Sequence, residues 1–371
     1  MVKSLYPRML YLSGILLLSS ACASVGGQPA PVAVSPAAPV PDIVTPPSAP
    51  SAPVPTQVAQ RADQPLGQRA DVREFIGEMA ARHGFDPVRL QALFNRVQVR
   101  PSIIAAMDRP AEAKPWHEYR SIFINARRVR VGVEFWRTHA ATLARAEQVF
   151  GVPPEIVVAI IGVETQYGGN MGRHRVLEAL ATLAFDYPRR ADFFRKELEA
   201  YLLLTRAEGI DPLTLRGSYA GAMGWGQFMP TSYLNYAVDF DGDGRRDLWQ
   251  NPRDAIGSVA NYFRQHGWRP GEPVVVPARI GDPSAAGLIT RRLTTPPTDS
   301  IASWRARGVA PLAPVGDRQA ALLLELAGRA GPEHWLAFHN FYVITRYNRS
   351  QLYAMAVYQL SQEIREHHAR S

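Results

Sequence analysis

The chain has 371 residues, of which 46% are hydrophobic and 20% are charged, and its formal net charge of +8 corresponds to a pI of about 9.7. This composition excludes a chain that is disordered throughout, and the length suffices for one large domain or two small ones. The positive charge favours anionic partners, namely nucleic acid, membrane surfaces or acidic cell-wall polymers. Cys22 is the only cysteine, which excludes an intramolecular disulfide and a cysteine-based zinc site.

Residues 1–21 have the pattern of an export signal. Lys3 and Arg8 precede an apolar run at 9–18, which is followed by small residues and is too short to span a bilayer comfortably. The sequence Leu-Ser-Ser-Ala-Cys at 18–22 is similar to a bacterial lipobox, except that Ser19 stands where leucine is usual. We therefore expect a lipoprotein signal peptide at 1–21 and lipidation of Cys22. An ordinary signal peptide with a stray cysteine is the alternative.

Residues 22–68 are predicted to form a tether. Within them, residues 28–65 hold 11 of the 31 prolines of the chain, interleaved with Ala, Val and Ser, and such a composition cannot build a core. A stretch of roughly 40 residues in the polyproline conformation, at about 3.1 Å per residue, reaches about 120 Å. The folded part, 69–371, is therefore expected to stand off a membrane.

Beyond the tether, apolar residues recur mostly at helical spacing. The spacing predicts amphipathic helices within 72–82, 87–97, 111–124, 128–150, 320–329, 333–341 and 350–366. Residues 272–295 differ, because β-branched residues bounded by Gly and Pro predict strands there. The chain is thus predicted to be mainly α with one small β excursion.

Residues 152–169 hold the first candidate for catalysis. Prolines at their start and glycines at their end predict a short helix, and the apolar residues between them predict its burial. Glu164 lies in the last turn, with no basic residue between Glu155 and Arg173. Burial without a cationic partner raises a carboxyl pKa, so Glu164 is a candidate general acid near neutral pH. The alternative is a glutamate that reaches solvent at the helix end.

Residues 217–233 form a segment rich in glycine and aromatic residues. The glycines let the backbone approach a ligand closely, and Ser218 and Gln227 add hydrogen-bonding groups. Sugar rings stack on aromatic faces such as those of Tyr219, Trp225, Phe228 and Tyr233. The alternative is a tight loop that carries core aromatic residues.

Three motifs together resemble the membrane-bound lytic murein transglycosylase B family. They are Gly-Val-Glu-Thr-Gln-Tyr-Gly at 162–168, Gly-Ser-Tyr-Ala-Gly-Ala-Met-Gly-Trp-Gly-Gln-Phe-Met-Pro at 217–230 and Asn-Phe-Tyr-Val-Ile-Thr-Arg-Tyr-Asn at 340–348. The resemblance covers about residues 72–366 and implies a mainly α protein with a lysozyme-like α-rich core, an additional helical region and a small β subdomain. The implied divisions are a helical region at about 69–145, a core at about 146–268, a β insertion at about 269–300 and C-terminal helices that complete the core and the helical region.

The resemblance also implies roles for individual residues. Glu164 matches the catalytic acid and base of the family, and Arg189 and Arg190 match a pair near the peptide-bearing sugars. The positions that line the glycan cleft of the family are matched by Ser218, Gln227, Tyr262, Tyr347, Asn348 and Tyr353. Two alternatives stay open: the arginine pair is a solvated surface turn, or any of the three tyrosines is a core residue with a satisfied hydroxyl group.

The reaction implied by the resemblance is a cleavage of peptidoglycan without water. Most glycoside hydrolases use two carboxylates, whereas this family uses one. Glu164 would protonate the β-1,4 glycosidic oxygen between N-acetylmuramic acid and N-acetylglucosamine, and the acetamido carbonyl would assist at the anomeric carbon. Glu164 would then take the proton of the C6 hydroxyl group, which leaves a 1,6-anhydromuramic acid end. No cofactor is expected for catalysis.

Residues 239–254 are predicted to bind an ion. They begin with a D-x-D-x-D-G pattern, in which carboxylates at loop positions 1, 3 and 5 and a backbone carbonyl at position 7 bind calcium. Gln250 occupies position 12, where a bidentate glutamate is usual, and a later aspartate is the expected substitute. The expected ligands of a structural Ca²⁺ ion are Asp239, Asp241, Asp243, Asp254 and the carbonyl oxygen of Arg245. A solvated acidic turn without metal is the alternative.

The expected partners are peptidoglycan strands and, through the lipid anchor, a membrane. Ala23, not Asp, follows Cys22, which by resemblance to bacterial lipoproteins indicates the periplasmic side of the outer membrane. The main alternative function is a non-catalytic, calcium-dependent peptidoglycan-binding lipoprotein, which has no reason to bury an unpaired Glu164. No nucleic-acid partner is expected, because the chain has an export signal and its basic residues are scattered.

Overall fold

The computed structural model describes residues 64–108 and 114–370, all of which belong to one compact unit. The predicted signal peptide at 1–21, Cys22 and most of the tether lie outside the described residues. Leu66 opens the short 3-10 helix η1 (Leu66–Gln68) and is buried in the core. The folded part therefore includes the last residues that the proline-rich composition had assigned to the tether.

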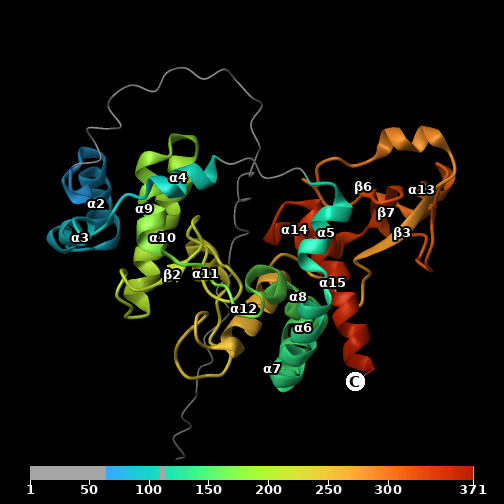
Figure 1. Cartoon of the computed structure of the whole chain (residues 1–371), viewed down its shortest axis with the longest axis horizontal. Helices are drawn as coiled ribbons and strands as arrows, with labels where there is room; N and C mark the ends of the chain where they lie inside the picture. Colours follow the sequence, from blue (N-terminus) through green and yellow to red (C-terminus); the bar gives the residue numbers. More distant parts are fainter. Residues whose placement is uncertain (1–63, 109–113, 371) are drawn as a thin grey trace, which may run out of the picture. The chain divides into compact units, whose positions relative to one another are not determined.

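The structure is mainly α, as predicted, and its α-helices follow the chain as Figure 1 shows. They are α2 (Ala70–His83), α3 (Pro87–Phe94), α4 (Pro101–Met107), α5 (Trp116–Phe123), α6 (Ala126–Thr138), α7 (Ala140–Phe150), α8 (Pro154–Thr165), α9 (Val176–Asp186), α10 (Ala191–Ala207), α11 (Pro230–Tyr236), α12 (Pro252–Gln265), α13 (Ile301–Ala306), α14 (His339–Tyr347) and α15 (Gln351–Ala369). Two further 3-10 helices are η2 (Pro188–Arg190) and η3 (Pro283–Leu288).

The N-terminal helices α2 and α3 pack onto the end of α9 through aromatic side chains. The rings of Phe75 and Phe94 each meet the ring of Phe185 edge to face, with centroids 5.8 and 6.4 Å apart. Arg69, just before α2, is buried and forms ion pairs of 2.7 Å with Asp71 and 2.8 Å with Asp186. These contacts fix the additional helical region on α9.

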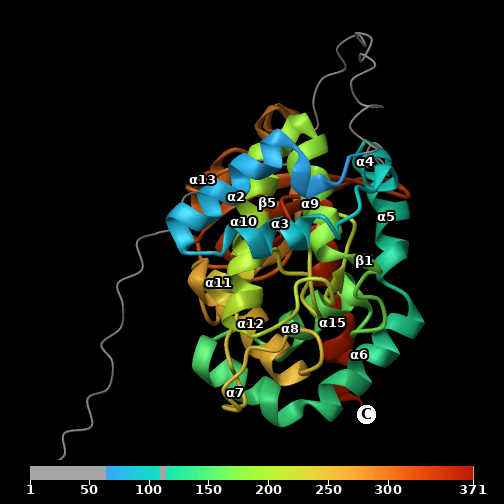
Figure 2. The same ribbon diagram turned by 90° about the vertical axis from the view of Figure 1, so that its left-hand side faces the viewer.

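Helix α8 lies at the centre of the core. Its sequence is apolar on nearly every face, and it packs against α6, α7, α12 and α15. Figure 2 shows α8 between α12 and α15. Pro154 starts the helix at a position that needs no amide donor, and Gln166 ends it in a left-handed conformation. No single described helix is long and apolar enough to cross a membrane; α7 and α8 together meet that criterion but are bent by 113°.

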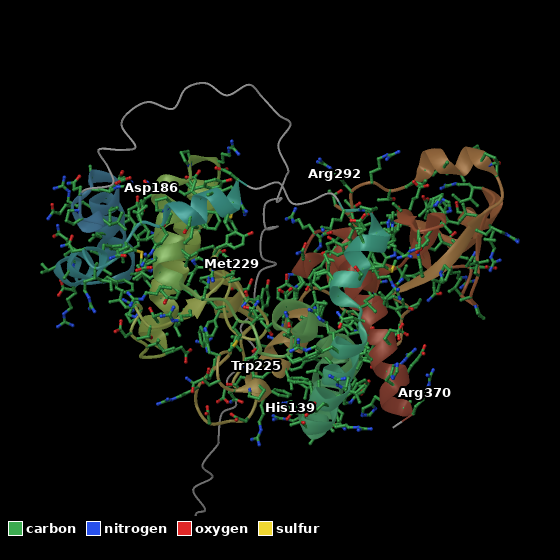
Figure 3. The ribbon with its side chains drawn as sticks, viewed as in Figure 1. His139, Asp186, Trp225, Met229, Arg292 and Arg370 are labelled. Atoms are coloured by element: carbon green, nitrogen blue, oxygen red, sulfur yellow. The ribbon has the colours of Figure 1, made fainter. Side chains whose placement is uncertain are left out.

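The prediction of one helix at 128–150 is wrong. The chain bends at His139, which Figure 3 labels, and forms the separate helices α6 and α7. Helix α6 packs against α8 and α15, whereas α7 packs against α12 and α8. Two differently oriented apolar faces are thus buried, which one straight helix could not achieve.

The strands form two antiparallel sheets. A two-stranded sheet joins β1 (His174–Arg175) to β2 (Arg216–Gly217), and a five-stranded sheet has the order β4-β6-β7-β3-β5. Its strands are β3 (Val275–Ile280), β4 (Asp299–Ser300), β5 (Val309–Pro311), β6 (Ala320–Gly328) and β7 (Gly331–Ala337). Within 272–295 only β3 is a strand, because residues 283–288 form η3 and the following residues are irregular.

The prediction of helices at 320–329 and 333–341 is also wrong. Strands β6 and β7 form a hairpin with Gly328 opposite Gly331, and only His339 and the residues after it are helical. Ala and Leu in β6 favour a helix locally, but β6 pairs with β7 and β4, and β7 also pairs with β3. These non-local pairs bury Leu323 and Leu336 against Trp304 of α13, so tertiary contacts override helix propensity. The strands therefore extend well beyond residue 300.

Candidate active site

Glu164 lies in the last turn of α8 and is half-buried. The turn after it is held by Tyr167, whose hydroxyl group donates to the backbone carbonyl of Arg128 at 3.0 Å. This hydroxyl packs so closely on Gly132 and Gly162 that a Cβ atom at either glycine would lie 2.5 Å from it. Glycine is needed at both positions for α6 and α8 to approach each other here.

The charge state of Glu164 depends on its surroundings. Burial raises its pKa from 4.5 to about 7, and a hydrogen bond from Tyr353 partly opposes this rise. The Tyr353 hydroxyl group donates to Oε1 of Glu164 at 2.5 Å. The sequence predicted a carboxyl group without a basic partner, and in the described structure its side-chain partner is a tyrosine of α15. Glu164 therefore holds or releases a proton near neutral pH, as a general acid and base must.

The three tyrosines expected near Glu164 lie at increasing distance from it along one aromatic cluster. Tyr353 contacts Glu164 directly. Burial raises the pKa of Tyr347, and the nearby charge of Glu164 raises it further. The ring of Tyr262 lies 4.7 Å from that of Tyr347, between centroids. The hydroxyl groups of Tyr347 and Tyr262 donate to the backbone carbonyls of Gly226 and Arg346. For Tyr262, which is buried, this matches the alternative of a core residue with a satisfied hydroxyl group.

The glycine-rich loop is fastened to the end of α8. The Thr165 hydroxyl group donates a hydrogen bond of 2.9 Å to the backbone carbonyl of Trp225. The ring of Trp225, which Figure 3 labels, packs against Gly168. Gln227 has a positive φ of 51°, and its side-chain amide donates to the backbone carbonyl oxygens of Gly224 and Met171. Ser218 accepts hydrogen bonds from the amides of two loop residues, at 3.2 and 3.0 Å. Both Ser218 and Gln227 are half-buried beside the segment that follows Glu164.

The remaining predicted residues lie at the ends of other elements. Asn348 ends α14, is exposed, and accepts a hydrogen bond from the amide of Ser350 at the start of α15. Arg189 of η2 is exposed and pairs with Asp108 at 3.3 Å, after α4. The guanidinium group of Arg190 lies 4.3 Å from the ring centroid of Phe193 in α10. Arg189 thus contacts the residue that ends α4, and Arg190 contacts α10.

Tyr119 is a site residue that sequence reasoning missed. It lies on α5, and burial together with the charge of Glu164 raises its pKa to about 12. Its ring centroid is 5.1 Å from that of Phe123. In the sequence, Tyr119 is one of several aromatic residues at helical spacing, and this pattern does not distinguish a core residue from one that faces a distant glutamate.

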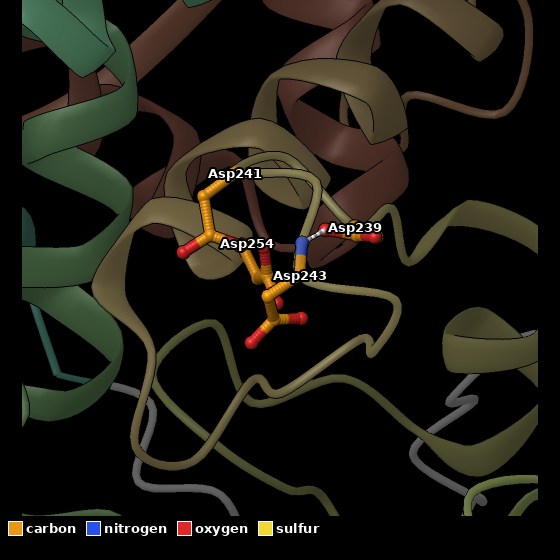
Figure 4. Close-up of side chains that lie close together, drawn as sticks. All are labelled: Asp239, Asp241, Asp243 and Asp254. Carbon is orange, nitrogen blue, oxygen red and sulfur yellow. Dashed lines mark hydrogen bonds between the residues drawn. The ribbon is translucent and has the colours of Figure 1, made fainter.

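The acidic loop brings four aspartates together, as Figure 4 shows. One carboxylate oxygen from each lies within 4.8 Å of the others: Asp239, Asp241, Asp243 and Asp254. The amide groups of Gly242 and Gly244 donate to Asp239, and they outweigh its partial burial and lower its pKa. Asp254 comes from the first turn of α12 and adds a fourth carboxylate to the cluster, whereas Gln250 carries none. Arg245 donates its backbone amide to Asp243.

Asp254 shows why this cluster suits a cation. Burial raises its pKa, and the charges of Asp241 and Asp239 raise it further, although the amides of Phe240 and Asp247 oppose this rise. Four carboxylates at this spacing repel one another unless a cation or protons neutralise them. Oxygen ligands of this number and kind fit a hard divalent cation such as Ca²⁺.

The fold, with a half-buried glutamate at the end of its central helix, defines an enzyme of the lysozyme-like class. The transglycosylase SLT domain model matches residues 67–362. The chain is 48% identical over 304 residues to the membrane-bound lytic murein transglycosylase B of Escherichia coli K12, which covers 79% of this chain and 82% of that protein. The chain therefore belongs to the transglycosylase SLT domain family.

Two solved structures support this assignment. Soluble lytic transglycosylase SltB1 from Pseudomonas aeruginosa superposes with a TM-score of 0.77 and 55% identity, over 81% of this chain and 99% of that one. Escherichia coli Slt35, solved in complex with calcium, superposes with a TM-score of 0.76 and 48% identity, over 81% of this chain and 95% of that one. The predicted family and the predicted mainly α, lysozyme-like fold are confirmed.

Proposed function

We propose that Glu164 is the acid and the base of a lytic transglycosylase reaction on peptidoglycan. The enzyme cleaves the β-1,4 bond between N-acetylmuramic acid and N-acetylglucosamine and forms a 1,6-anhydromuramic acid end. The observation that carries the assignment of Glu164 is its raised pKa of about 7, with a neutral tyrosine rather than a cation as its side-chain partner. A carboxyl group of this kind is available in both protonation states near neutral pH.

The reaction needs two proton transfers at one side chain. Protonated Glu164 gives its proton to the glycosidic oxygen while the bond from C1 to that oxygen breaks, and the acetamido carbonyl of the muramic acid stabilises C1. Ionised Glu164 then takes the proton of the C6 hydroxyl group as O6 bonds to C1. Glu164 is restored, and water is not consumed. The hydrogen bond from Tyr353 favours the ionised state that occurs between the two transfers.

The glycan is proposed to contact the residues that surround Glu164. Two of these residues, Ser218 and Gln227, lie beside the segment after α8. Two others, Tyr347 and Asn348, lie at the end of α14, where the ring of Tyr262 packs against that of Tyr347. Arg189 and Arg190 are proposed to contact the stem peptides, because guanidinium groups bind carboxylates well. Their contacts with Asp108 and Phe193 involve no residue of the aromatic cluster, which supports a role in peptide binding rather than in bond cleavage.

Mass spectrometry of the products from purified sacculi tests the reaction. Anhydromuramic ends are expected, whereas reducing ends would indicate a hydrolase. The alternative of a non-catalytic peptidoglycan-binding lipoprotein predicts no new ends at all. A Glu164→Gln variant that binds sacculi without cutting them would support the role of Glu164.

We propose that the acidic loop binds Ca²⁺ through Asp239, Asp241, Asp243 and Asp254, with the backbone carbonyl of Arg245 as a further ligand. The geometry of the four carboxylates and the calcium complex of the Escherichia coli relative support this proposal. The ion would neutralise the cluster and hold the loop that precedes α12. Its role is structural, because Glu164 has no part in the cluster.

The N-terminal segment is proposed to anchor the enzyme. Lipidation of Cys22 after removal of residues 1–21 would place the catalytic domain, from about residue 69, on the periplasmic side of the outer membrane at the end of the tether. The membrane-bound relative supports an association with a membrane. A Cys22→Ala variant should be released in soluble form and still cleave murein, and an inactive but folded variant would contradict this separation of anchoring and catalysis.

A further inference from the structure

We propose that a small cationic cavity next to the end of α8 binds a carboxylate group carried by the glycan substrate. The cavity has a volume of about 180 Å³ and is lined by Asn125, Arg127, Arg128, Val131, Gln166 and Tyr167. The inference rests on the proposed action on peptidoglycan, and it adds a binding site that the arginine pair at 189–190 does not supply.

The lining of the cavity includes the two residues that follow Thr165 at the end of α8. Gln166 ends α8 two residues after Glu164, and Tyr167 ties the same segment to the backbone of Arg128. The guanidinium carbon of Arg128 lies 5.4 Å from the ring centroid of Phe123. Phe123 in turn lies beside Tyr119, the tyrosine that responds to the charge of Glu164. The cavity is thus linked to Glu164 both through the chain, by Gln166 and Tyr167, and through the side chains of Phe123 and Tyr119.

The charge of the cavity favours an anion. Two guanidinium groups line it, and within the described part of the chain its lining contains no carboxylate. Nη1 of Arg128 is buried and has no hydrogen-bond partner among the described residues. Burial lowers the pKa of Arg128, although Tyr167 opposes this effect. A buried, incompletely paired cation is costly, and the planar fork of arginine suits a carboxylate.

The size of the cavity indicates a substituent rather than a whole sugar. Sites for complete small-molecule ligands usually have volumes of about 300–1,000 Å³, which is more than this cavity offers. Gln166 and Tyr167 both have positive φ angles, 53° and 58°, which are uncommon for residues other than glycine. Such backbone strain is concentrated at functional sites. In peptidoglycan, carboxylates occur on stem peptides and, where the peptide has been removed, on the lactyl group of muramic acid.

Steady-state kinetics of Arg127→Met and Arg128→Met variants test the proposal. Loss of a hydrogen bond to a charged group typically weakens binding by about tenfold or more, so KM should rise about tenfold while kcat stays within twofold of wild type. Arg130→Met is the matched control, because Arg130 is an exposed arginine of the same helix outside the cavity. Arg127 is itself exposed, so its variant keeps the test valid if the Arg128 variant does not fold.

Two substrates distinguish the source of the carboxylate. One is glycan strands with intact stem peptides, and the other is strands whose peptides have been removed by an amidase, which frees the lactyl carboxylate. A rise in KM only on the first substrate identifies a stem-peptide carboxylate, and a rise only on the second identifies the lactyl group. A rise on both means that the cavity accepts either carboxylate.

The proposal is contradicted if KM for both variants stays within twofold of wild type on both substrates. It is also contradicted if Arg130→Met raises KM by as much as Arg127→Met does, because the effect would then reflect general surface charge. Mass spectrometry of the new sugar ends tests the proposed reaction separately. Wild-type enzyme that forms no anhydro ends contradicts the reaction, whereas the KM pattern concerns binding alone.

Discussion

The Glu164 site and the acidic loop are built in opposite ways. Glu164 accepts a hydrogen bond from Tyr353, which lies 189 residues later in the chain, and its charge acts on Tyr119 of a helix that precedes it. The four aspartates all lie within residues 239–254, and their hydrogen bonds come from the same segment, mostly from backbone amides and in one case from the side chain of Asn251. We therefore expect changes at the Glu164 site to act mainly on catalysis and changes in the loop mainly on stability.

The largest effect is expected from Glu164→Gln. Glutamine keeps the shape of the side chain but neither gives nor takes the required proton, so kcat should fall by about 10²- to 10⁴-fold or more. The rate of anhydromuramic acid formation measures the loss. Glu155→Gln is the matched control, because Glu155 lies on the same helix and also has a pKa raised by burial, but it pairs with Arg365. Turnover within tenfold of wild type would remove Glu164 from the mechanism.

A smaller effect is expected from Tyr353→Phe. The variant removes the hydrogen bond that favours ionised Glu164, so the pKa of Glu164 should rise further and kcat should fall about tenfold. The alkaline limb of the pH–rate profile reports loss of the proton that Glu164 must hold for the first transfer, and this limb should move to higher pH. Tyr358→Phe on the same helix serves as the control. An unchanged profile would mean that Tyr353 acts only in packing.

Removal of calcium is expected to lower the stability of the protein much more than its activity. An ion that binds only the folded state adds about 2.7 kcal/mol at a hundredfold excess over its Kd, so a chelator should lower Tm by about 5 °C and calcium should restore it. Activity well below Tm should change little. The double variant Asp241→Asn, Asp243→Asn should mimic the chelator, whereas Asp282→Asn, an exposed aspartate outside the cluster, should not. Melting curves indifferent to chelator and to millimolar calcium would identify the cluster as a solvated turn.

The smallest effect concerns the stability of the catalytic site. The pKa of Glu164 is raised in the folded state, so the unfolded chain releases its proton first as pH rises from about 4.5 to about 7. The carboxyl group therefore costs stability above this window and not below it. Glu164→Gln should have a Tm about 2 °C above that of wild type at pH 8 and nearly equal to it at pH 4.5. A difference independent of pH would contradict the raised pKa.

The sequence allowed the prediction of features whose information is local. Proline and glycine at 153–169 mark both ends of α8, and its apolar residues predict burial, so Glu164 could be singled out without knowledge of its neighbours. The aspartate spacing at 239–243 likewise indicated an ion site, and Asp254, four residues after Gln250, could be proposed from the resemblance to a family with a longer loop. Both inferences depend on residues that are close together in the chain.

Only the tertiary structure decided features that depend on distant contacts. Residues 320–328 favour a helix locally but form β6, because pairing with β7 and β4 stabilises a strand. The bend at His139 and the approach of Tyr119 to Glu164 also have no local signal. The sequence by itself determined the short motifs, because their residues are neighbours in the chain. Tertiary packing decided which of these motifs and helices meet, because burial and pairing energies outweigh the weak preferences of single residues.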